Sequence, residues 1–117
     1  MVLDKFAEFE IKGKNHKLCY PLKYVWEAER QLRDRNFILI VANAANNIPP
    51  SMGDIYVMFK YALLGGNPLL TEKEADELYL AAVEDNDPVV LLRAALDALK
   101  KSGALGKGKK AQAAPEA

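Results

Sequence analysis

The stretch from Pro49 to Gly66, PPSMGDIYVMFKYALLGG, restricts the fold more than any other part of the chain. Ser51 precedes an apolar run and Asp54 falls in its first turn, a pattern typical of a helix start, because the serine side chain caps a backbone N–H and the helix dipole favours a carboxylate there. Gly65 and Gly66 predict where this helix ends. The sequence therefore predicts a helix between these signals.

This predicted helix is apolar on nearly every side. The face expected in the core consists of Ile55, Met58, Phe59, Ala62 and Leu63. The opposite face consists of Tyr56, Val57, Tyr61 and Leu64. A helix of this kind is either central or meets a partner, so we expect the opposite face to be covered by the apolar block Phe37 to Ala45 or by another protein. Lys60 interrupts the run, which has about half the length of a bilayer span, so no membrane helix is expected.

Length and charge limit the remaining choices. The 117 residues predict a single domain over 1–103 and a Gly/Lys/Ala-rich, disordered tail over 104–117. Lysine and arginine (16) balance aspartate and glutamate (16), which argues against nucleic acid as the main partner. Cys19 is the only cysteine, so neither an internal disulfide nor a cysteine-rich metal site is expected. The opening MVLDKFAEFE does not resemble a signal peptide, and we expect a cytoplasmic protein.

The N-terminal part predicts a β-hairpin. Strands are expected over Phe6 to Ile11 and His16 to Tyr20, joined by a turn at Lys12 to Asn15, since Gly and Asn tolerate the positive φ of tight turns. Ala7, Phe9 and Ile11 alternate with glutamates, so one face of the hairpin is apolar. A lone hairpin is only marginally stable, and this face must rest on helices.

Helices are predicted around the central one. Helical spacing indicates a first helix from Pro21 to about Arg33. The block Phe37 to Ala45 is compatible with a strand because Ile38, Ile40 and Val41 are β-branched, but its alanine-rich continuation favours a helix.

Two further helices have clear start signals. Thr71 and Glu74 form a capping-box pattern that opens a helix ending near Glu84. Its expected inner face is Ala75, Leu78, Tyr79 and Ala82. A last helix is expected from Asp87 and Pro88 to a point before Gly103, with Val89, Leu92, Ala95, Leu96 and Leu99 as its apolar stripe. The predicted fold is α+β, a hairpin packed on four to five short helices.

The sequence has no group of residues that indicates catalysis. His16, the only histidine, is expected on the exposed register of the hairpin, and its odd spacing from Cys19 places the two on opposite strand faces. The acids between Glu72 and Asp87 lack the alternating ligands and glycine of a calcium loop, and no glycine-rich stretch has a phosphate-loop ending. We expect no enzyme activity, cofactor or metal.

Protein binding is the function that the side chains favour. Aromatic residues and methionine are enriched at interfaces, and the candidate contact residues are Trp26, Met52, Tyr56 and Tyr61, each of which core packing would also explain. Lysines at the hairpin end and acids from Thr71 to Asp87 favour head-to-tail self-association or a charged partner, although mixed surface charges are also ordinary.

The order of these signals resembles a known family. The chain runs from KLCYPL into YVWEAERQL, then through a Pro-Pro-Ser turn, an apolar helix ending in LLGGNP and a TEKEADEL helix. Over Phe6 to Ser102 this is similar to the tail assembly chaperones of long-tailed bacteriophages and related prophages. The resemblance implies the short product of a frameshifting gene, which coats the tape measure protein, recruits tail tube subunits by binding alone, and is absent from the finished virion.

The tail is compatible with that family. Leu105 to Lys107 can be encoded with G GGA AAG and Gly108 to Lys110 with A AAA AAG, two heptamers on which a programmed −1 frameshift can occur, and Gly-Lys tracts are also common in ordinary tails. Two alternatives stay open. One is a head–tail connector or tail completion protein retained in the virion, and the other is a small nucleic-acid-binding regulator that uses the hairpin lysines, which the neutral net charge disfavours.

Overall fold

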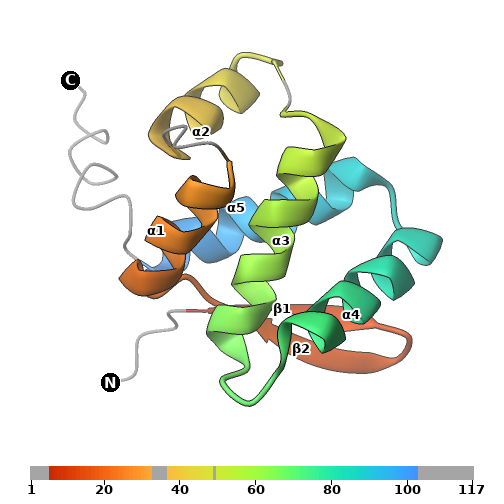
Figure 1. The fold of residues 1–117 in the computed structure, drawn as a ribbon. Coiled ribbons are helices and arrows are strands. Elements are labelled where there is room, and N and C mark those ends of the chain that lie inside the picture. The colour runs from red at the N-terminus through yellow and green to blue at the C-terminus, as the bar shows by residue number, and fades with distance from the viewer. Residues whose placement is uncertain (1–5, 33–36, 49, 103–117) are drawn as a thin grey trace.

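The computed structural model of the chain describes residues 6–32, 37–48 and 50–102. The elements are β1 (Ala7–Ile11), β2 (Lys14–Leu18), α1 (Leu22–Gln31), α2 (Phe37–Ala45), α3 (Met52–Gly66), α4 (Glu72–Asp85) and α5 (Pro88–Ser102). The strands form an antiparallel hairpin and the helices gather on one side of it, with α3 at their centre (Figure 1). The predicted α+β fold is confirmed, and the block 37–45 is a helix; the predicted tail 104–117 lies outside the described residues.

The hairpin turn is shorter than the sequence suggested. Lys12 and Gly13 alone connect the strands, with φ of 52° and 84°, the pair of positive values that a type I′ turn requires. Ile11 therefore pairs with Lys14, and the register continues to Ala7 opposite Leu18. The expectation of a turn reaching Asn15 is wrong, because the two-residue turn lets pairing begin at Lys14. The apolar face is as predicted, with Ala7 and Ile11 buried and Phe9 partly buried.

His16 does not lie on the exposed register. It is opposite Phe9 and shares a strand face with the fully buried Leu18, so the alternation of β2 turns its ring inward. The side chain is half-buried, and its Nε2 is buried without a hydrogen-bond partner among the described residues. Burial, followed by the charge of Lys14, lowers the pKa of His16 from its ordinary value of 6.5.

The central helix α3 packs against α1, α4, α5 and β2. Its start is as predicted, since the Ser51 side chain accepts a hydrogen bond from the Asp54 backbone N–H at 3.2 Å. The face predicted to lie in the core is buried. It consists of Ile55, Met58, Phe59, Ala62 and Leu63. Phe59 extends this core to the hairpin and to α4, because its ring packs on Phe9 at 5.3 Å and on Tyr79 at 5.8 Å between centroids.

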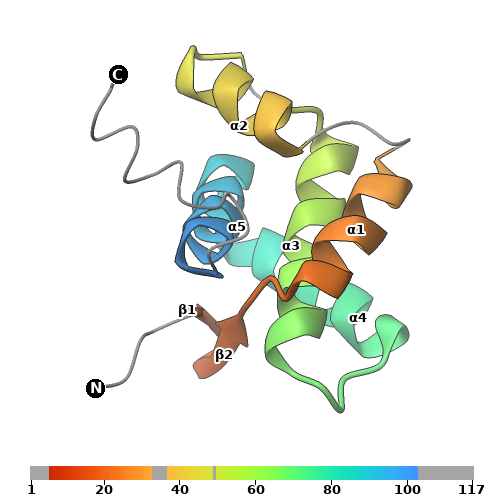
Figure 2. The same ribbon diagram turned by 90° about the vertical axis from the view of Figure 1, so that its left-hand side faces the viewer.

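The opposite face of α3 is covered by neighbouring helices of the same chain. Tyr61 packs beside Tyr24 of α1 at 6.4 Å, and Tyr56 packs edge-on against Tyr79 of α4 at 5.2 Å. The expectation that α2 or a partner protein covers these tyrosines is therefore wrong. The reason is the position of α2, which lies at the end of the molecule away from the hairpin (Figures 1 and 2), where Ile40 is buried and Val41 packs against the core.

The end of α3 lies directly against the outer edge of β2. A Cβ atom on Gly65 would collide with the carbonyl oxygen of Cys19, and one on Gly66 with that of Lys17. This close approach allows the Cys19 backbone N–H to donate to the Ala62 carbonyl at 2.9 Å, and the Asn67 amide to donate to the Lys17 carbonyl at 2.9 Å. The two glycines thus do more than end the helix, because they let its backbone dock on the strand.

The last two helices follow their start signals. Thr71 and Glu74 form the capping box reciprocally, at 3.1 and 3.0 Å. The expected inner face of α4 is confirmed, with Ala75, Tyr79 and Ala82 buried and Leu78 packed against the core. In α5 most of the expected stripe is confirmed: Leu92, Ala95 and Leu99 are buried and Leu96 packs against the core. Leu91 and Ala98 are fully buried as well, whereas Val89 is exposed. Val89 belongs to the first turn of α5, which extends past the core at the α4–α5 corner.

Replacing Gly66 with alanine should destabilise the fold, because the new methyl group meets the backbone of Lys17, which cannot move without breaking the hairpin pairing. We expect the free energy of unfolding to fall by about 1–3 kcal/mol in chemical denaturation. Gly53→Ala is the matched control, since nothing lies within 4 Å of an added Cβ there and the change should stay below about 1 kcal/mol. Equal effects of the two substitutions would contradict the close approach.

Replacing His16 with leucine should make stability less sensitive to acid. Because the folded protein lowers the pKa of His16, its neutral form contributes stability fully above the ordinary value of 6.5, and this contribution is lost as pH falls through the lower folded value. Denaturation at pH about 7.5 and about 5 should show wild type losing stability relative to His16→Leu at the lower pH. If wild type and His16→Leu differed in unfolding free energy by the same amount at both pH values, the lowered pKa of His16 would be disproved.

Candidate partner-binding surface

Exposed apolar side chains are concentrated in one part of the described chain. Of the nine exposed large apolar residues, five lie on α1, on α2, in the connection that follows α2, or in the first turn of α3. They are Leu22, Trp26, Leu39, Ile48 and Met52, which we call the 22–52 surface. The sequence region that was expected to supply contact residues thus carries five of the nine large apolar side chains that are exposed among the described residues.

Helix α1 is the best-defined part of this surface. Its inner face is Val25 and Ala28, both buried where α1 packs along α3. Leu22 and Trp26 are one helical turn apart on the outer face, 56% and 59% exposed. An indole left in water on a helix that is otherwise well packed is a costly arrangement for a monomer, and it is typical of a residue that a partner covers.

Met52 is the second expected contact residue that the structure leaves exposed. It is 59% exposed in the first turn of α3, at the end of that helix which points away from the hairpin (Figure 1). Leu39 and Ile48 are exposed on α2 and just after it. These flexible and branched apolar groups can adapt to a partner surface without a change in the core.

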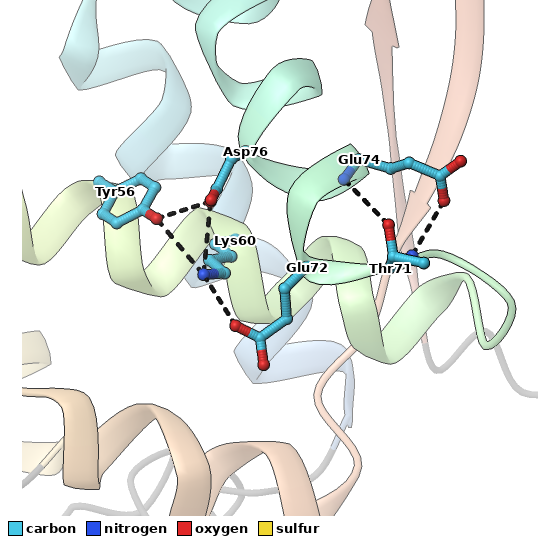
Figure 3. Close-up of polar contacts among 6 residues, drawn as sticks. All are labelled: Tyr56, Lys60, Thr71, Glu72, Glu74 and Asp76. Atoms are coloured by element: carbon cyan, nitrogen blue, oxygen red, sulfur yellow. Dashed lines mark hydrogen bonds and ion pairs between the residues drawn. The ribbon is translucent and has the colours of Figure 1, made fainter.

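Tyr56 and Tyr61 are used inside the monomer instead. Tyr61 is only 6% exposed. The Tyr56 hydroxyl donates a hydrogen bond to Asp76 Oδ1 at 2.6 Å while its ring rests on Tyr79, so this half-buried side chain joins α3 to α4 (Figure 3). The four expected contact residues are therefore divided: Trp26 and Met52 face solvent, and the two tyrosines hold α3 against its neighbours.

Lys60 is the residue whose role the sequence did not reveal. Its Nζ lies 3.2 Å from Glu72 Oε1, 3.3 Å from Asp76 Oδ1 and 3.3 Å from the Tyr56 hydroxyl, with only 11% of the side chain exposed (Figure 3). Burial by itself lowers the pKa of Lys60, but the hydrogen bonds to Tyr56 and Glu72 and the nearby Asp76 outweigh it, so the net pKa is raised. The cation is held charged between α3 and α4.

This network is a structural connection between helices. Burial and the hydrogen bond to Asp76 both raise the pKa of Tyr56, so its phenol stays protonated and remains the donor at neutral pH. One pattern in the sequence could have indicated this contact: Lys60 is an isolated lysine within an apolar helix, and the next helix begins with several acidic residues. A buried lysine needs such carboxylates, because an unpaired buried charge is strongly unfavourable.

The described residues also limit what else the site can be. Within residues 6–32, 37–48 and 50–102, no group of three or more His, Cys, Asp and Glu side chains is arranged to hold a metal ion. Cys19 directly follows β2 and lies three residues from His16, so strand alternation directs the two side chains to opposite faces and does not bring them together as a nucleophile and base.

In the part of the chain that the structure describes, no helix combines the length and the apolar character that crossing a membrane requires.

Comparisons of the chain with models of protein families, with curated proteins and with solved structures found no match.

Removing the Tyr56 hydroxyl should measurably weaken the junction of α3 and α4. Tyr56→Phe keeps the ring on Tyr79 and deletes the bond to the Asp76 carboxylate, so we expect the free energy of unfolding to fall by roughly 1.5–3 kcal/mol. The matched control is Tyr24→Phe on α1, which should change stability by less than about 0.5 kcal/mol. Both are measured by urea denaturation, and a Tyr56→Phe variant as stable as wild type would show that the network contributes nothing.

Proposed function

We propose that this protein is a tail assembly chaperone of a long-tailed phage or prophage, acting in the host cytoplasm. In this proposal it binds the tape measure protein, helps to recruit tail tube subunits and catalyses no reaction. The observation that supports it most is the outer face of α1, where Leu22 and Trp26 are exposed although the inner face is well packed. The order of hairpin and helices is also the order that the resemblance to this family led us to expect.

The physical argument starts from the cost of exposed apolar area. Covering a tryptophan and a leucine on one helix face removes enough apolar surface from water to contribute several kcal/mol to association, at about 25 cal/mol per Å². A long helical partner presents apolar residues with the same helical spacing, so its stripe can lie along α1. Such a contact shields apolar positions of the tape measure protein until tube subunits replace the chaperone.

Charged side chains around Trp26 would orient the partner. Lys23 and Arg30 are exposed on α1, and among the described residues Arg30 forms a long, exposed ion pair of 3.6 Å with Glu27. Exposed pairs of this kind contribute little to stability, so these cations remain available to acids that flank an apolar stripe. The polar rim and apolar centre match the usual anatomy of a protein interface.

Tyr61 and Tyr56 then have an indirect role. Tyr61 supports α1 through Tyr24, and Tyr56 fixes α3 against α4, so both hold the helices that present Trp26 and Met52. The proposal therefore assigns direct contact to Trp26 and Met52 and support to the tyrosines. This arrangement lets a rigid core display a surface that a partner can bind without much ordering cost.

The test is binding of the tape measure protein encoded by the same phage or prophage. Trp26→Ala should weaken the affinity about 10–30-fold, because buried tryptophans are frequent interface hot spots, while circular dichroism and thermal melting remain close to wild type. Leu80→Ala on α4 is the matched control, since Leu80 is equally exposed but lies outside the 22–52 surface. Affinity is measured by calorimetry on co-expressed, purified proteins.

Two results would contradict the proposal. One is wild-type affinity in Trp26→Ala, and the other is an equal loss in Leu80→Ala, which would indicate non-specific adhesion of apolar surface.

A further inference from the structure

The two edges of the hairpin are unlike each other. The type I′ turn makes Ile11 and Lys14 a hydrogen-bonded pair, so the backbone groups of Glu8 and Glu10 on β1, and those of Asn15 and Lys17 on β2, point away from the partner strand. The bond that the Lys17 carbonyl accepts from Asn67 agrees with this direction. Each edge therefore presents a row of donors and acceptors.

The edge of β2 is occupied by the protein itself. Gly65, Gly66 and Asn67 at the end of α3 lie against Lys17 and Cys19, and the Ala62 carbonyl accepts the Cys19 N–H. No further strand can pair along this part of β2 without displacing α3.

The edge of β1 is open over the described residues. Within them the sheet has two strands, and the outward backbone groups of Glu8 and Glu10 form no hydrogen bond with another described element. Both side chains are exposed, and neither forms an ion pair with another described residue. The inner face below this edge is closed, because Ala7 and Ile11 are buried against the core. The hairpin thus presents a supported strand edge bordered by two carboxylates.

We propose that the outer edge of β1 binds an extended segment of a partner protein, which adds a third strand and places lysine or arginine beside Glu8 and Glu10. Backbone pairing supplies the affinity, and the cations select the segment, since opposite charges on neighbouring strands are favourable and like charges are not. Because successive side chains alternate, the two cations are separated by one residue, and that residue lies on the helix side of the sheet.

The helix side suits an apolar residue at that position. Helix α5 packs on β1, and it leaves Val89 and Val90 exposed in its first turn. Lys12 Nζ forms ion pairs with Glu84 Oε1 at 2.8 Å and Asp85 Oδ2 at 3.1 Å. These ion pairs connect the hairpin turn to the corner between α4 and α5, next to the two valines. The segment that fits is therefore basic, apolar, basic in alternation.

A second copy of the chain does not fit this edge. Antiparallel pairing of two β1 strands in the central registers places Glu8 of one copy opposite Glu8 or Glu10 of the other, which is repulsive. The other edge, on β2, is covered by α3 in both copies. Since neither strand of a second copy fits, we assign the edge to a different chain. This inference is independent of the tail-chaperone proposal, because it uses neither Trp26 nor Met52.

The test uses a synthetic peptide of alternating lysine and valine and the full-length, ¹⁵N-labelled protein. Amide exchange of Glu8 and Glu10 should slow about tenfold or more at saturating peptide, because their outward N–H groups become hydrogen-bonded. The same peptide with N-methyl groups on the residues that would pair with β1 keeps every charge and side chain, and it should lose the protection.

Charge-reversing variants test whether the Glu10 side chain contacts the peptide. Glu10→Lys should weaken binding of the lysine peptide about tenfold and improve binding of a peptide with glutamate in place of lysine. Glu77→Lys on α4 makes the same charge change away from the hairpin and should leave binding nearly unchanged. Binding of the N-methylated peptide as tight as that of the parent, or equal losses in Glu10→Lys and Glu77→Lys, would overturn the proposal. So would a dimer of the free protein in sedimentation that Glu10→Lys abolishes, since a second copy would then occupy the edge.

Discussion

The close approach between the end of α3 and the edge of β2 is the constraint on which the rest of the structure depends. A two-stranded hairpin is marginal alone, and here one of its edges is completed by helix backbone, through the Cys19 to Ala62 and Asn67 to Lys17 hydrogen bonds. Only residues without a side chain allow that distance at positions 65 and 66. The buried Tyr20 hydroxyl, which donates to the Met58 carbonyl, adds a further connection one helical turn deeper. Burial raises the pKa of that phenol well above its ordinary value, so it remains a donor.

Docking the hairpin in this way fixes where α3 runs, and its apolar surface then has to be covered on every side. The hairpin and α5 cover one face with close aliphatic and aromatic packing around Phe59. Helices α1 and α4 cover the other through Tyr24 and Tyr79. Asp54 and Lys60 are the buried charged residues of α3, and the ammonium group of Lys60 is compensated by Glu72 and Asp76 from the start of α4. The same acids that mark α4 as a surface helix in sequence thus serve a largely buried cation.

The sequence predicted those features that depend on short-range interactions. The Ser51 cap, the Thr71 and Glu74 capping box and the alternation of β1 all involve residues within a few positions of one another, and all are present. Features that depend on distant neighbours were not predictable. Which helix covers Tyr61, and which acids pair with Lys60, follow only from the arrangement of helices around α3. His16 was misplaced although its strand was recognised: it is two residues from the buried Leu18, so strand alternation alone places both side chains on the inner face. The division of the candidate contact residues could not be predicted in this way, because spacing places Trp26 and Tyr61 on helices but does not say which helix packs on which side.

The attachment of α2 rests on few of its described side chains, with Ile40 buried and Val41 packed against the core. A helix attached in this way can detach at a lower free energy than the hairpin and α3, which share hydrogen bonds and a fully buried interior. Detachment would expose additional apolar side chains next to α1 and to the start of α3, while the core persisted. The apolar area that a partner can cover is then larger in the opened form than in the closed structure. A partner that binds the opened form gains free energy from this larger contact, which offsets the free energy needed for opening.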